Sequence, residues 1–212
     1  MIFYGKRILF IGAHPDDIEI GAGAFLHHIG KRSNVLCVTL SDNQKNPLLQ
    51  SILTEHYASM EVLGIPKENI LVEKFTTRKF PEARQDILEY MLKLRREFNP
   101  DIIFVHSKHD LHQDHNVVAD EALRAYRGIT VLGFDVIRSS NGFFPDFLVE
   151  VHEEDVQKKV DALARYKTYA DKYYFNPELL RSINIRHGSL AECQFAEGFD
   201  ILRIVGRFEP CG

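Results

Sequence analysis

The sequence predicts an α/β fold, with an open, mostly parallel sheet that carries helices on both faces. Three short, continuously apolar runs at residues 7–12, 34–40 and 101–105 are rich in β-branched side chains, as is typical of strands buried on both faces of a parallel sheet. Between them, apolar residues recur three and four positions apart at residues 18–29, 51–63 and 82–97, which indicates helices. This alternation implies right-handed crossovers and therefore a Rossmann-like sheet.

The remaining elements continue the same alternation. Residues 70–72 are a weak strand candidate, residues 116–126 predict a helix, and residues 131–134 predict a fifth strand. After Pro145 we expect a strand at residues 147–151, a charged helix at residues 153–169 and a last strand at residues 199–205. The chain of 212 residues shows no internal repeat, low-complexity segment or long linker, so residues 1–212 are expected to form a single domain.

Composition and charge exclude several classes of protein. The chain has 45% apolar and 26% charged residues, as an ordinary folded domain does, and its net charge of −4 argues against a broad basic face for nucleic acid. Cys37, Cys193 and Cys211 are scattered, which argues against a disulfide framework and favours a reducing compartment. No apolar run approaches the ~20 residues that span a bilayer. We expect a cytoplasmic protein with a small-molecule substrate, and a homo-oligomer is compatible with the sequence.

The first cluster of potentially catalytic or metal-binding side chains lies directly after the first predicted strand. His14-Pro15-Asp16-Asp17 places a histidine and two carboxylates in a strand-to-helix loop, where open α/β sheets bind ligands. Helix capping is the alternative, because a carboxylate near a helix start accepts free backbone N–H groups and proline suits the first turn. Capping does not account for His14. Glu19, in the first helical turn, needs no explanation beyond the helix dipole.

A second polar cluster follows the strand at residues 101–105. Residues 106–115 read His-Ser-Lys-His-Asp-Leu-His-Gln-Asp-His and hold four of the ten histidines of the chain. We interpret His106 and His109 as members of a polar surface loop. For His112 and His115, which form an H-x-D-H motif at a helix start, we favour a functional role.

The expected topology brings the two clusters together. In the usual 3-2-1-4-5 strand order, the first and fourth strands are neighbours, so their loops meet. An H-x-x-D pair from one loop and a histidine from the other then leave a coordination position open for water, as in catalytic zinc sites. The same ligand set suits Fe(II) in an oxygenase. We rank zinc first, because Asp16 and His112 remain beside the metal as a base and an acid for hydrolysis.

Both motifs make the chain resemble the PIG-L/LmbE-like zinc-dependent N-deacetylases. The family motif A-H-P-D-D is matched by residues 13–17, with a glycine-rich helix after it, and the motif H-x-D-H is matched by residues 112–115. Weaker family features occur at residues 55, 63–64, 99–101 and 196–199, so the resemblance covers nearly the whole chain.

The resemblance implies a zinc-dependent amide hydrolase that removes an acetyl group from an amino-sugar-containing small molecule. The metal ligands that it implies are His14, Asp17 and His115. It makes Asp16 the general base and His112 the general acid or oxyanion stabiliser. Asp114 would hold an imidazole in the required orientation.

One departure from the family affects the substrate side of the site. Many relatives carry an arginine that contacts substrate hydroxyls three residues before the glutamate matched by Glu55, and this position is Ile52 here. Cations expected at the ligand-binding edge are Lys45, Lys108 and Arg138, which would suit the diphosphate of a nucleotide-linked sugar. The polar loop at residues 41–46 fits either a solvated loop or a substrate lid.

Two further interpretations of the whole chain stay open. An Fe(II)-dependent oxygenase would use the same ligand set, although such enzymes usually place it on antiparallel barrels. A catalytically inactive metal- or ligand-binding module would have no need of Asp16 and His112. The aromatic side chains at residues 166–175 are interpreted as helix-packing residues rather than as a sugar-binding surface.

Overall fold

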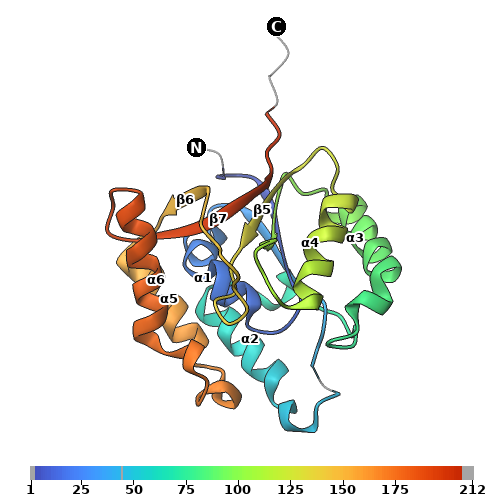
Figure 1. Ribbon diagram of the computed structural model, residues 1–212, viewed down its shortest axis with the longest axis horizontal. Helices are drawn as coiled ribbons and strands as arrows, with labels where there is room; N and C mark the ends of the chain where they lie inside the picture. Colours follow the sequence, from blue (N-terminus) through green and yellow to red (C-terminus); the bar gives the residue numbers. More distant parts are fainter. Residues whose placement is uncertain (1–2, 44, 207–212) are drawn as a thin grey trace, which may run out of the picture.

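Seven strands form one sheet in a computed structural model that describes residues 3–43 and 45–206 (Figure 1). The strand order is β3-β2-β1-β4-β5-β7-β6. The strands are β1 (Arg7–Gly12), β2 (Asn34–Thr39), β3 (Ile70–Val72), β4 (Ile102–His106), β5 (Thr130–Phe134), β6 (Phe147–Glu150) and β7 (Ala196–Arg203). The first five pair in parallel, and β7 runs antiparallel to both β5 and β6. The predicted Rossmann-like, mostly parallel sheet is confirmed.

Six helices cover the two faces of this sheet. They are α1 (Asp17–Gly30), α2 (Ile52–Val62), α3 (Arg84–Phe98), α4 (Gln113–Ala125), α5 (Glu153–Leu163) and α6 (Pro177–Leu190). Figure 1 shows α3 and α4 on one side of the sheet and α1, α2, α5 and α6 on the other. Alternate side chains of β1 enter separate cores, Ile8 and Phe10 on the α1 side and Leu9 and Ile11 on the α3 side. The strands are therefore apolar on both faces, as the continuous runs predicted.

Several expectations for the last third of the chain were wrong. The predicted charged helix ends at Leu163 instead of residue 169, and short 3₁₀ turns follow at Lys167–Tyr169 and Tyr173–Phe175. The sequence analysis missed α6, although Asn176 caps it by accepting the backbone N–H groups of Glu178 and Leu179 ahead of a first-turn proline. The last strand begins at Ala196, three residues before the predicted start.

A break in α1 explains the family feature at residues 196–199. Ala22 leaves helical geometry with φ −143° and ψ 15°, which frees backbone N–H groups beyond the break. Glu197 accepts two of them, from Ala24 at 3.1 Å and Phe25 at 2.6 Å. Lys159 of α5 donates to the same carboxylate at 2.7 Å, so the buried charge is paired. This carboxylate acts as an N-cap for the second half of α1.

Two other observations concern the expectations from composition. Cys37 and Cys193 are free thiols, and Cys211 lies outside the described residues. Within the described part of the chain, every helix is too short or too polar to cross a bilayer.

Candidate active site

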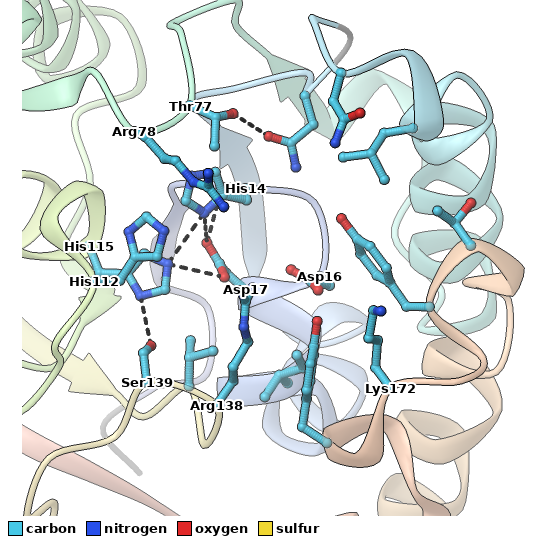
Figure 2. A pocket seen from close by; sticks show the side chains of 18 of the residues that line it. His14, Asp16, Asp17, Thr77, Arg78, His112, His115, Arg138, Ser139 and Lys172 are labelled. Atoms are coloured by element: carbon cyan, nitrogen blue, oxygen red, sulfur yellow. Dashed lines mark hydrogen bonds and ion pairs between the residues drawn. The ribbon is translucent and has the colours of Figure 1, made fainter.

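The loops after β1 and β4 meet at the carboxyl edge of the sheet. The two strands are parallel neighbours, with Phe10 beside Phe104, so their C-terminal loops leave the sheet side by side. Figure 2 shows His14, Asp16 and Asp17 from the first loop facing His112 and His115 from the second in one pocket. The predicted meeting of the two clusters is therefore present in the structure.

Asp16 does not behave as a helix cap. It precedes α1 with φ 97°, a left-handed conformation that side-chain-bearing residues rarely adopt, and its carboxylate makes no capping hydrogen bond. Burial and the neighbouring charge of Asp17 raise its pKa well above the ordinary value. A strained, buried carboxylate that faces a pocket indicates a functional group and removes the capping explanation for this residue.

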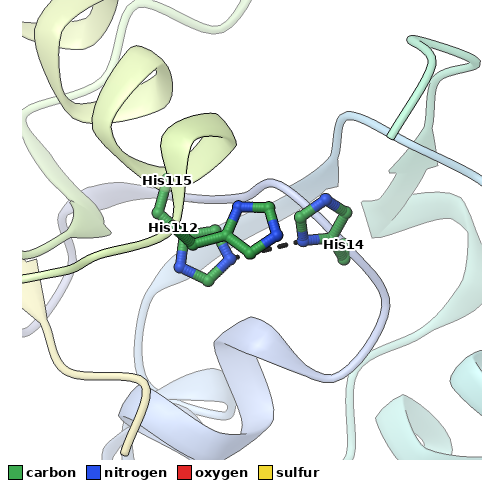
Figure 3. Close-up of side chains that lie close together, drawn as sticks. All are labelled: His14, His112 and His115. Carbon is green, nitrogen blue, oxygen red and sulfur yellow. Dashed lines mark hydrogen bonds between the residues drawn. The ribbon is translucent and has the colours of Figure 1, made fainter. Parts of the chain in front are cut away.

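His14, Asp17 and His115 present two ring nitrogens and two carboxylate oxygens at metal-ligand spacing. His14 Nδ1 lies 3.4 Å from Asp17 Oδ2 and 3.3 Å from His115 Nε2, and His115 Nε2 lies 3.5 Å from Asp17 Oδ1. Bonds of about 2.0–2.1 Å place two ligands of a tetrahedral zinc ion about 3.3 Å apart. Figure 3 shows the rings of His14 and His115 directed at each other, with His112 beside them. The donor set therefore fits a divalent metal.

His14 and His115 each have their own carboxylate partner. Asp114 Oδ2 lies 3.0 Å from His14 Nε2, and Asp110 Oδ2 lies 2.8 Å from His115 Nδ1. These contacts place a ring proton on each far nitrogen and direct His14 Nδ1 and His115 Nε2 at each other. Asp114 thus holds an imidazole, as expected. Sequence reasoning missed Asp110, which contacts its histidine from five residues earlier in the same loop.

Burial and neighbouring groups shift the pKa values of His14 and His115. Burial lowers the pKa of His14, but its hydrogen bonds to Asp114 and Asp17 outweigh burial and raise the pKa to about 9. Burial and the charge of His106 lower the pKa of His115 to about 4. Burial and neighbouring charges therefore shift the two rings in opposite directions, the pKa of His14 upwards and that of His115 downwards.

His112 is placed to donate a hydrogen bond into the pocket. It caps α4, and its Nδ1 accepts the backbone N–H of Asp114 at 3.1 Å. The ring proton of the neutral form must then sit on Nε2. Burial and the charge of His14 lower the pKa of His112, which favours this neutral form.

The interpretation of His106 as a surface-loop residue was wrong. It is the last residue of β4 and is 0% exposed, because the loop begins only after it. Its Nε2 accepts the backbone N–H of Ala13 at 3.0 Å and lies 3.3 Å from Asp17 Oδ2. His109 is exposed, as expected.

Among the described residues, His115 belongs to two groups of side chains that could hold a metal ion. One group contains His14 and His112, and the other contains Asp17 and His106; within each group the possible ligand atoms lie within 4.8 Å of one another.

The chain is similar to known proteins over the region that contains both of these loops. Residues 9–126 match the family model PIG-L, described as GlcNAc-PI de-N-acetylase, and this range contains both histidine motifs. An uncharacterized deacetylase of Escherichia coli, YaiS, is 30% identical over 171 residues, which are 77% of this chain and 91% of the relative.

This chain belongs to the PIG-L family.

Solved structures show the same fold at low sequence identity. N,N'-diacetylchitobiose deacetylase of Pyrococcus horikoshii has a TM-score of 0.72 and 20% identity, covering 93% of this chain and 84% of its own. GalB, a 4-carboxy-2-hydroxymuconate hydratase from Pseudomonas putida, has a TM-score of 0.73 and 20% identity, covering 96% of this chain and 100% of its own. Because one fold carries two chemistries, the side chains of the site must decide the reaction.

A large cavity opens beside the histidines of this PIG-L family member. Its volume is about 1040 Å³, which exceeds what a single sugar ring needs. Loops after β1, β2, β3, β4 and β5 line it together with the segment after α5. The polar loop at residues 41–46 contributes Asn43, Lys45 and Asn46, so it lies at the pocket rather than away from it.

The segment after α5 forms one wall of the cavity. Tyr166 and Phe175 belong to the hydrophobic core, as the packing interpretation expected. Tyr169 and Tyr174 pack against this core and also line the cavity, together with Lys172. The wall is anchored at Tyr166, whose hydroxyl donates to Glu19 at 2.6 Å in a fully buried contact that His56 also joins. Glu19 therefore has a tertiary role that the helix dipole does not explain.

The position of the missing arginine lies inside the core. Ile52 is fully buried in the α1-side hydrophobic core and does not line the cavity. Glu55, one turn later, accepts the backbone N–H of Thr168 at 3.2 Å and so supports the same cavity wall. The family glutamate thus holds the wall in place while the arginine position provides no polar contact to a substrate.

Proposed function

We propose that this chain is a zinc-dependent hydrolase that removes an N-acetyl group from an amino-sugar-containing small molecule. The observation that carries the proposal is the spacing of His14, Asp17 and His115, with Asp16 and His112 beside them and outside the ligand set. Membership of a de-N-acetylase family and the deacetylase relatives support the reaction class.

Within this proposal we assign each residue of the site a role. His14, Asp17 and His115 would hold a Zn²⁺ ion, which would supply Lewis acidity and lower the pKa of water towards ~7. Asp16, buried at the pocket floor with a raised pKa, takes the proton of the attacking water and passes it to the departing amine. His112 donates from Nε2 to the oxyanion of the tetrahedral intermediate. Asp114 and Asp110 fix the ring orientations of the two histidine ligands.

The test combines metal analysis with an amine-release assay. The purified chain should contain about one Zn²⁺, and chelation should abolish amine release from N-acetylglucosamine derivatives. His115→Ala should lose the metal, whereas the matched variant His109→Ala, at an exposed histidine of the same loop, should keep both metal and turnover. Retention of stoichiometric metal by His115→Ala would contradict the ligand assignment.

The same experiment separates the two rival interpretations. Iron recovered under anaerobic purification, together with oxygen consumption, would favour an Fe(II)-dependent oxygenase. Bound metal without release of any amine would favour an inactive metal- or ligand-binding module. The cytoplasmic location suggested by the scattered cysteines stays a prediction.

Within this reaction class we favour a nucleotide-linked N-acetylhexosamine as substrate. Two of the three expected cations, Lys45 and Arg138, line the cavity, whereas Lys108 pairs with Asp120 and lies outside the lining. Arg78 adds a further cation. Among the described residues none of these three cations has a carboxylate within ion-pair distance. Lys45 Nζ donates to Thr76 Oγ1 at 2.6 Å, and the Arg138 guanidinium lies 5.5 Å from the centre of the Tyr174 ring. A diphosphate would therefore meet cations whose charge is not neutralised by a carboxylate.

The nucleotide preference is tested with matched substrates. Arg138→Ala should lower the specificity constant for uridine-diphosphate-linked N-acetylglucosamine and leave that for the free sugar unchanged. Lys108→Ala serves as the control outside the cavity. Equal constants for the two substrates in the native chain would remove the phosphate site and leave the deacetylase assignment intact.

A further inference from the structure

One cavity residue combines burial with an unusual backbone conformation. Asn43, in the loop after β2, has φ 55°, is only 8% exposed and lines the cavity beside the catalytic loop. Asparagine is one of the few residues that tolerate the left-handed region, in which glycine alone is free of strain. Since β2 is the parallel neighbour of β1, Asn43 approaches the site from the side opposite the histidines of the β4 loop.

Two hydroxyl groups fix the orientation of the Asn43 amide. Thr77 Oγ1 donates to Asn43 Oδ1, as Figure 2 shows for the labelled Thr77, and Ser41 Oγ donates to the same oxygen at 3.4 Å. The backbone N–H of Asn43 donates to Ser41 Oγ at 3.3 Å, and the two hydroxyl oxygens lie 2.9 Å apart. The amide oxygen is thus engaged by Ser41 of the same loop and by Thr77 of the loop after β3, and the other polar group of the side chain is the NH₂, which only donates.

Asn43 offers the substrate a fixed hydrogen-bond donor, which the position of the missing arginine does not. Ile52 is buried in the core and offers no hydrogen bond to a sugar hydroxyl. The neighbouring wall carries Asn43, with its amide held rigidly and therefore with little entropy to lose on binding. A sugar hydroxyl oxygen accepts such a hydrogen bond, and a buried donor left without it is costly, which gives discrimination against sugars that lack the hydroxyl.

We propose that Asn43 is a specificity-determining residue, which donates a hydrogen bond from its side-chain NH₂ to one ring hydroxyl of the substrate sugar. The inference rests on the proposed function, because it identifies how the same site recognises its sugar. Asn43 touches the substrate and not the reacting atoms, so its effect falls on KM, while kcat depends on the residues around the metal.

The experiment is a double-mutant cycle between the chain and the sugar. Substrates are N-acetylglucosamine glycosides in which the 3-, 4- or 6-hydroxyl is replaced by hydrogen. In the native chain one analogue should lose about tenfold in kcat/KM, the size of one lost hydrogen bond. In Asn43→Gly, which keeps the left-handed backbone, KM for the parent substrate should rise about tenfold, and the same analogue should lose nothing further.

The matched control is Asn99→Gly, at the C-cap of α3. Asn99 also has a left-handed backbone, with φ 48°, and lies outside the cavity lining. It should keep native kinetics, and all variants should keep native metal content. Two results would overturn the inference while amine release continues. One is additive losses in Asn43→Gly. The other is a native KM in Asn43→Asp, which retains the engaged oxygen and removes the NH₂. Absence of amine release from every N-acetylated hexosamine in the native chain would instead refute the proposed function, and this inference with it.

Discussion

Asp16 and Asp17 are adjacent in sequence and have opposite environments. Burial and the charge of Asp17 raise the pKa of Asp16. Burial also opposes ionisation of Asp17, but its close contacts with His115 and His106 hold its pKa well below the usual range. Neighbouring carboxylates with pKa values pushed apart are a recurring sign of divided acid–base roles. Asp16 is suited to take a proton, and Asp17 to remain an anion.

Asparagine substitutions at these two positions should therefore differ. Asp16→Asn should keep the metal and lower kcat by about 10²-fold or more, because it removes the base and no ligand. Asp17→Asn should weaken metal binding, because it removes the anionic ligand. Metal content by atomic emission and single-turnover amine release measure the two effects. Equal loss of metal in both variants would mean that both carboxylates are ligands.

Asp110 should act on the metal through His115. Its carboxylate holds His115 Nδ1 at 2.8 Å and also accepts the backbone N–H of His112 at 2.7 Å. Asp110→Asn should weaken metal affinity by about 10–100-fold, as loss of such a partner typically does. Competition with a fluorescent zinc chelator measures the affinity. Asp120→Asn, on the same helix-and-loop segment but outside the cavity lining, is the control and should bind metal normally.

Among the elements, α1 depends on a contact that is distant in sequence. Its first turn carries Asp17 and its break is capped by Glu197 of β7, which Lys159 of α5 neutralises. Gly21 lies so close to β5 that a Cβ atom there would be 2.3 Å from Phe134 Cδ2. The position of the helix that carries the site is therefore set by three other elements.

Breaking this buried ion pair should destabilise the protein strongly. Glu197→Ala leaves Lys159 as an unpaired buried charge and frees two backbone N–H groups, so the free energy of unfolding should fall by about 3–5 kcal/mol. Urea denaturation measures the change. The double variant Glu197→Ala with Lys159→Met should recover part of the loss, because it removes the unpaired charge. A loss below ~1 kcal/mol in the single variant would contradict the capping role.

At the scale of the whole molecule, His187 should link stability to pH. It is buried between α6 and β7, and burial, together with the charges of Lys159 and Arg186, lowers its pKa to about 4 from 6.5. Between about pH 6.5 and pH 4, His187 binds a proton in the unfolded chain and stays neutral in the folded chain. The stabilisation by neutral His187 is therefore complete above pH 6.5 and is lost as pH falls towards 4.

Thermal unfolding between pH 7.5 and 5 checks this prediction. The native chain should lose Tm as pH falls, and His187→Gln should show a shallower dependence. His152→Gln, at an exposed histidine, should keep the native slope. All three chains are compared at the same metal saturation, so that the histidines of the site contribute equally. Identical slopes for the native chain and His187→Gln would exclude His187 as the source.

The sequence by itself determined the alternation of strands and helices and the two motifs at the ends of β1 and β4. Both are local signals, because apolar periodicity reports which faces are buried and a motif at a strand end inherits its position from the strand. The strand order 3-2-1-4-5 then sufficed to bring His14, Asp17 and His115 together, since general rules of parallel sheets decide which loops are neighbours.

Only the tertiary structure decided which polar side chains are buried and what each of them contacts. His106 looks like any other histidine of a polar run, and Glu19 like any first-turn glutamate, yet both are fully buried because distant elements cover them. The cavity wall at residues 164–176 follows the end of α5, and its Tyr166 is held by Glu19, 147 residues away. Contacts over such separations leave no periodicity in the sequence, and their energy exists only once the sheet has brought the partners together.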